Sequence, residues 1–174
     1  MNFITLLWLL TALAFRSSCG NETDIDAPVD ALRAIASVPK FVLLVATVDI
    51  PMLECLTADL TAFDASAGTA TYIWHIGGQD GQKQQDFPVH YVLSKGSDRG
   101  VAFMNADTSN PIPAQVVYSD YKSCLISKMY PGSQEVCFLW VSPETVAAVP
   151  EACTTAMKDK CGGGVVLYKD DTCK

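Results

Sequence analysis

The sequence predicts an all-β fold: an eight-stranded antiparallel up-and-down barrel with a short helix before it and a helix packed outside it. Eight strand-like runs follow one another between residues 41 and 141, and each break carries Gly, Pro, Asn or Ser. Short links make consecutive strands pair as a meander, and eight such strands close into a barrel that holds one small ligand. A β-sandwich is the competing architecture, but it needs Greek-key connections and gives no reason for a C-terminal helix tied to two strands.

The elements follow in order from the sequence. A first helix is expected over Asp26–Ala36, where an acid and a proline precede an apolar stripe. The expected strands are Phe41–Val48, Leu53–Phe63, Thr69–Ile76, Phe87–Leu93, Val101–Met104, Gln115–Tyr118, Tyr121–Met129 and Val136–Val141. A helix then starts after Pro143 and again after Pro150, and Gly162 ends it. A last short strand, Val165–Tyr168, leads to Cys173.

The first 20 residues are typical of a signal peptide. The apolar run from Phe3 to Phe15 is too short for a membrane span, and Ser17, Cys19 and Gly20 suit a cleavage site. A structured N-terminal helix is the alternative. We therefore expect a signal peptide over residues 1–20, one domain over residues 21–174 and a secreted, extracellular protein. Asn21 opens a glycosylation sequon next to the new N-terminus.

Composition and charge exclude several classes of function. The formal net charge is −7 and no basic stripe occurs, which argues against nucleic acid and against a membrane surface as partners. His75 and His90 stand alone among strand residues, without the spacing of a metal site or a catalytic triad. We expect no cofactor, no metal and no enzymatic activity, and we expect a monomer.

The cysteines carry the most specific pattern. Six remain after residue 20, which predicts three disulfides in an oxidising compartment. Cys153 and Cys161 lie eight residues apart on the expected helix, about 12 Å along its axis and too far to bridge each other. If the helix packs outside the strands that carry Cys124 and Cys137, Cys124–Cys153 and Cys137–Cys161 form together, which leaves Cys55 with Cys173. A pairing of Cys124 with Cys137, or another of the 15 possible frameworks, remains open.

Several segments resemble the tick salivary lipocalins, the group that includes the histamine-binding proteins. The segments that carry the likeness are Tyr118–Cys124, Cys137–Trp140, Val149–Cys153 and Val166–Cys173. The resemblance covers roughly residues 115–173. It implies a lipocalin (calycin) barrel with the pairs Cys55–Cys173 and Cys124–Cys153, and Cys137–Cys161 is similar to the third pair of the japanin-type members. It also implies secretion in saliva and binding of histamine or another biogenic amine.

The cysteines also predict which side chains face the interior. If Cys124 and Cys137 point outward, alternation turns Tyr121, Ser123, Leu125, Ser127 and Met129 inward on one strand and Val136, Phe138 and Trp140 inward on the next. Amine-binding members of the resembled family carry acids at the positions of Leu125 and Phe138. Because both acids are missing, the interior favours a hydrophobic ligand such as a lipid or a sterol over an amine. Asp49, Glu54 and Asp59 are candidate acids for a second amine site. The candidate ligand contacts are Trp140, Phe138, Leu125, Trp74, Tyr91, Tyr72 and Tyr121.

These observations predict a salivary lipocalin that sequesters a small host mediator and so helps to evade host defence. The alternative is an immunomodulator that binds a host immune protein or cell surface through the barrel loops. The candidate loops are the segment Gly77–Asp86 and the turn Ser97–Gly100.

Overall fold

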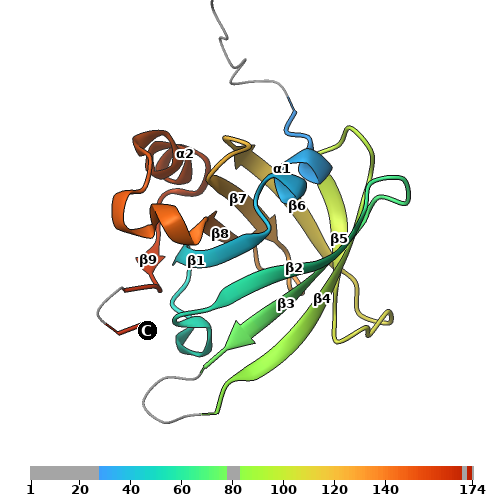
Figure 1. Cartoon of the computed structure of the whole chain (residues 1–174), viewed down its shortest axis with the longest axis horizontal. Coiled ribbons are helices and arrows are strands. Elements are labelled where there is room, and N and C mark those ends of the chain that lie inside the picture. The colour runs from blue at the N-terminus through green and yellow to red at the C-terminus, as the bar shows by residue number, and fades with distance from the viewer. Residues whose placement is uncertain (1–27, 78–82, 170–171, 174) are drawn as a thin grey trace, which may run out of the picture.

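The structure is a computed structural model of the chain, shown in Figure 1, and it describes residues 28–77, 83–169 and 172–173. The expected signal peptide over residues 1–20 and the sequon at Asn21 lie outside the described residues. The helices are α1 (Ala31–Ser37), η1 (Pro51–Leu53), η2 (Pro143–Ala148) and α2 (Glu151–Cys161). The strands are β1 (Lys40–Ala46), β2 (Thr57–Asp64), β3 (Thr69–Ile76), β4 (Gln85–Leu93), β5 (Arg99–Met104), β6 (Ile112–Ser119), β7 (Cys124–Met129), β8 (Val136–Val141) and β9 (Val165–Val166).

The first eight strands form a closed antiparallel barrel of the lipocalin type, as the sequence predicts. Each strand pairs with the next, and β1 closes the circle by pairing with both β2 and β8. The closing pairs are Phe41 with Ala58 on one side of β1 and Leu43 with Trp140 on the other. The short β9 adds to the far end of β1, where Val165 lies opposite Ala46. The eight-stranded meander is therefore confirmed, with β9 outside the circle.

Helix α1 lies across one end of the barrel (Figure 1). It begins later than the sequence predicts because Asp30 is its N-cap and its carboxylate accepts the backbone N–H of Arg33 at 3.0 Å. The backbone N–H of Ala31 donates to the carbonyl of Ser97 in the β4–β5 turn at 3.0 Å. These contacts fix α1 as the plug of this end.

Helix α2 packs on the outside of β6, β7 and β8 (Figure 1). Pro150 precedes its first residue, and Gly162 ends it in the left-handed conformation at φ 80°. Two disulfides join α2 to the wall, Cys124–Cys153 and Cys137–Cys161, and Cys55–Cys173 joins the C-terminal tail to the residues before β2. The three pairs are the expected ones.

The disulfides separate two apolar cores. Inside the barrel, Leu125, Met129, Phe138 and Trp140 belong to one buried cluster. On the other face of the same strands, the cysteines of β7 and β8 pack with residues of α2 in a second cluster, which includes Ile126, Leu139, Val141, Ala156 and Met157. The predicted inward and outward phase of β7 and β8 is therefore confirmed.

Two strands start later than the sequence analysis predicts. Pro51 starts a 3₁₀ turn, and Cys55 follows with a positive φ of 56°, so β2 begins at Thr57 and Cys55 lies before the strand. Tyr121 also has a positive φ, 55°, so β7 begins at Cys124. Bends of this kind break the two-residue alternation on which the prediction relied.

Candidate functional site

The barrel encloses a cavity whose wall is mostly apolar. The space that holds no atom is about 530 Å³ when the open mouth is included, but only about 50 Å³ of it is open to the centre of a water molecule, so a larger ligand must displace side chains of the wall. Its aromatic wall residues are Phe41, Trp74, Tyr91 and Trp140, and aliphatic side chains from α1 and from the strands fill the gaps between them. A concave apolar space with few polar groups is the usual form of a small-molecule site.

The aromatic rings of the wall contact one another around Trp140. The ring centroids of Trp140 and Trp74 are 5.4 Å apart, and those of Trp140 and Phe138 are 5.9 Å apart. The Trp140 indole Nε1 donates to the hydroxyl of Ser127 at 3.0 Å. Trp140 is therefore fixed both by packing and by a hydrogen bond, and it presents a flat ring surface to the cavity.

The structure places the seven predicted contact residues in three settings. Trp140, Leu125, Trp74 and Tyr91 line the cavity. Phe138 and Tyr72 are buried in the same interior cluster but are not among the residues that line the cavity. Tyr121, expected on a strand, lies in the bend before β7. Four of the seven side chains thus come together at one cavity.

Tyr72 binds the end of helix α1 and does not line the cavity. Its hydroxyl lies 3.2 Å from the carbonyl oxygens of both Ile35 and Val38 and donates to this pair at the end of α1. Burial, reinforced by the neighbouring Tyr91, raises the pKa of Tyr72 far above its usual value, so the hydroxyl stays a donor. Its edge-on contact with Tyr91, at 6.1 Å between centroids, joins the plug to the wall.

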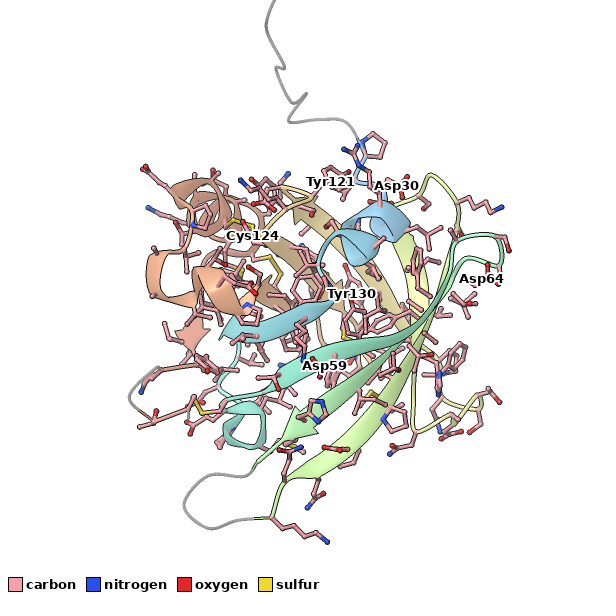
Figure 2. The ribbon with its side chains drawn as sticks, viewed as in Figure 1. Asp30, Asp59, Asp64, Tyr121, Cys124 and Tyr130 are labelled. Atoms are coloured by element: carbon pink, nitrogen blue, oxygen red, sulfur yellow. A yellow bond between two sulfur atoms is a disulfide. The ribbon has the colours of Figure 1, made fainter. Side chains whose placement is uncertain are left out.

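Tyr121 belongs to the same plug. Figure 2 shows it beside Asp30 at the α1 end of the barrel. The Tyr121 hydroxyl accepts the backbone N–H of Asp30 at 3.0 Å, and the Arg33 guanidinium stacks over the ring at 4.2 Å from its centroid. This side chain therefore fixes the start of α1, and it is not among the residues that line the cavity.

The sequence analysis missed one acidic residue that lines the cavity, Asp98. Asp98, in the turn between β4 and β5, accepts a hydrogen bond from Gln115 Nε2 at 2.6 Å, and its side chain is 24% exposed. Arg99 Nε lies 3.8 Å from the other carboxylate oxygen. No signal marked it, because alternation assigns faces to strand residues and not to turn residues. Among the cavity-lining residues that the structure describes, Asp98 is the one carboxylate.

The three acids proposed from the sequence lie elsewhere. Asp59 is on the outer face, where it pairs with Lys40 at 3.0 Å and lies 3.6 Å from His75, and Figure 2 shows it on β2. Asp49 and Glu54 are exposed near the β1–β2 connection. None of the three lines the cavity.

A possible metal cluster among the described residues does not have the right chemistry. Asp120, Cys124 and Cys153 bring ligand atoms within 4.8 Å of one another. The two cysteines are bonded to each other and offer no thiolate, and the Asp120 carboxylate already accepts the backbone N–H of Cys124 at 2.9 Å. Asp120 is the cap of the bend before β7.

Comparison with known proteins decides the family. A family model described as tick histamine binding protein matches residues 21–174. The chain belongs to this family.

No curated protein matched it in sequence. In the part of the chain that the structure describes, no helix is both long and apolar enough to cross a membrane.

Solved structures of lipocalins share the fold of this family member. The AM182 serotonin complex is 19% identical with a TM-score of 0.64 and covers 84% of this chain and 94% of its own. Japanin from Rhipicephalus appendiculatus bound to cholesterol is 14% identical with a TM-score of 0.61 and covers 80% and 97%. Apocrustacyanin C2 is 11% identical with a TM-score of 0.52 and covers 79% and 80%. At these identities the likeness establishes the fold alone.

Proposed function

We propose that the protein is secreted in saliva and sequesters a small, largely apolar host mediator in its barrel, without catalysis, to evade host defence. The observation that carries the proposal is the cavity wall, where Trp140, Trp74, Tyr91 and Leu125 form a continuous apolar surface. Leu125 and Phe138 occupy the places where amine-binding relatives carry acids, so a buried ammonium would lack those partners. A lipid mediator, a fatty acid or a sterol fits such a wall.

Asp98 supports a second candidate, an amine with an aromatic or aliphatic body. A carboxylate in an otherwise apolar wall attracts a cationic head, and flat rings beside it accommodate the body of the ligand. The solved relatives carry one ligand of each kind, serotonin in AM182 and cholesterol in japanin. The amine candidate therefore depends on a different acid from those of the family pattern.

A protein-binding role through loops remains the alternative. The Ser97–Gly100 turn is already engaged inward, because the Ser97 carbonyl accepts from Ala31 and Asp98 lines the cavity. Part of the Gly77–Asp86 loop lies outside the described residues. Cavity binding is thus the function that the described residues support best.

The test uses the two tryptophans of residues 21–174, Trp74 and Trp140, which both line the cavity. Delipidated secreted protein is titrated with oleate, cholesterol, serotonin and histamine, and quenching of tryptophan fluorescence reports occupancy. We expect saturable quenching by oleate or cholesterol that is unchanged in Asp98→Asn. Tight binding of an amine that drops about tenfold or more in Asp98→Asn selects the second candidate. Absence of saturable binding by all four ligands, in protein with native circular dichroism, contradicts cavity binding of both kinds.

A further inference from the structure

The outer wall of the barrel is covered on one side only. Helix α2 packs over β6, β7 and β8, where the outward side chains join the second apolar cluster. No described helix packs on the outer face of β3, β4 and β5 (Figure 1). The outward side chains of these strands therefore face away from both cores.

Six apolar residues form what is here called the outer-wall patch: Ile73, Pro88, Val92, Val101 and Phe103 on β3, β4 and β5, and the exposed Pro113 near the start of β6. They alternate with the inward residues of their strands, and none of them belongs to either buried cluster. Val92 is 45% exposed, although it is a large aliphatic side chain in the middle of the patch. Pro113 is also exposed, and Ile73, Pro88, Val101 and Phe103 are half-buried. A contiguous apolar patch marks a contact surface more often than scattered single residues do.

The strand register makes the patch continuous. Ile73 lies opposite Pro88, and Val101 lies opposite both Val92 and Pro113. The polar pair in its middle is already satisfied, because Thr71 Oγ1 and His90 Nδ1 are 2.9 Å apart. Burial of the patch would therefore leave Thr71 Oγ1 and His90 Nδ1 partnered, and the other ring nitrogen of His90 would need a partner across the contact.

Charges occur at the two ends of the patch and have opposite signs. Asp86 lies on the outward row of β4 at one end, and its side chain is 57% exposed. Arg99 lies at the start of β5 at the other end, and its side chain is 73% exposed. Between them the outward rows of β4 and β5 carry no Asp, Glu, Lys or Arg.

We infer that two copies of this protein associate through the outer-wall patch, with the strands of one copy antiparallel to those of the other. A two-fold axis in the interface, perpendicular to the strands, places Asp86 of each copy at the Arg99 end of its partner. The parallel arrangement would instead bring like charges together. The inference does not depend on the proposed ligand, and it departs from the monomer expected from the sequence.

The net charge of the chain restricts where two copies can meet. With a formal charge of −7, two copies repel each other over most of their surface. Association therefore needs a region where acidic residues are absent or are matched by bases. The outer-wall patch satisfies both conditions, since its centre is uncharged and its ends are complementary.

Sedimentation of the secreted protein over a range of concentrations tests the inference, with Asp86→Arg, Arg99→Asp, the double variant and Val101→Lys. We expect a monomer–dimer equilibrium that each single charge reversal weakens about tenfold or more. The double variant restores complementarity and should return the dissociation constant to within about threefold of the original. Val101→Lys should abolish the dimer. Glu144→Arg, which makes the same charge change on exposed η2, is the matched control and should leave the equilibrium unchanged.

All five variants alter side chains on the outer face, and circular dichroism together with the thermal midpoint verifies that each one is folded. A monomer at millimolar concentration would overturn the inference. A dimer that persists in Val101→Lys would overturn it too, because the contact would then lie elsewhere. Failure of the double variant to recover association would refute the antiparallel arrangement.

Discussion

Ser127 accepts a hydrogen bond from the indole of Trp140 in the cavity wall. Its replacement by alanine tests whether water can reach that indole N–H. The Ser127 hydroxyl accepts the Trp140 indole N–H at 3.0 Å, and Trp140 is only 5% exposed. Ser127→Ala therefore leaves a buried donor without a partner, which costs about 1–3 kcal/mol of unfolding free energy. For a domain of this size the thermal midpoint should fall by roughly 2–10 °C.

Denaturant unfolding with the disulfides intact measures this loss, and tryptophan fluorescence and circular dichroism should agree. Trp140→Phe supplies the control, because it removes the donor while keeping an aromatic ring. In the Trp140→Phe background, Ser127→Ala should cost less than about 0.5 kcal/mol, so the double-mutant cycle yields a coupling of about 0.5 kcal/mol or more. A cost below about 0.5 kcal/mol for Ser127→Ala alone would show that water satisfies the indole, and the dry wall would be refuted.

Two further predictions concern the bend before β7 and the β9 junction. Burial raises the pKa of Asp120, but hydrogen bonds from the backbone of Cys124 and from Ser123 outweigh it and hold the pKa below its ordinary value. The stabilisation is therefore present above about pH 4 and is lost as the pH falls through the folded-state pKa. The thermal midpoint between pH 5 and pH 2 should fall less steeply in Asp120→Asn than in the original protein, and parallel profiles would refute this role. Gly164→Ala should destabilise the protein by about 1–3 kcal/mol, because a Cβ there would lie 2.3 Å from the Ala46 carbonyl oxygen. Denaturant unfolding measures the loss, and a change of less than about 0.5 kcal/mol would contradict the clash.

The sequence predicted the barrel, and it also predicted which side chains of β7 and β8 face inward. On these two strands the positions of the cysteines and the alternation of apolar residues lead to the same assignment. Cys124 and Cys137 could reach α2 only from the outer face, so alternation assigned Leu125 and Trp140 to the interior. Those two residues now line the cavity together. The prediction was reliable where a strand is regular and one of its side chains has a known direction.

The same reasoning failed where the backbone leaves the extended conformation. Tyr121 and Cys55 both sit at positive φ, so neither continues the strand that follows it. Asp98 lies in a turn, and its approach to the cavity depends on how that turn folds back onto Gln115 of β6. Such a contact depends on the register of β5 with β6, in which Arg99 lies opposite Gln115, and on the conformation of the turn, and no spacing in the sequence gives either.

The two bonds from α2 have a consequence for the width of the cavity. They hold β7 and β8 at a fixed distance from a helix, whereas β3, β4 and β5 have no such brace among the described residues. Trp140 stands on the braced half and Trp74 on the unbraced half, with their rings in contact. A ligand wider than the cavity would therefore have to displace β3, β4 and β5, which carry Trp74, because the disulfides to α2 hold β7 and β8 in place.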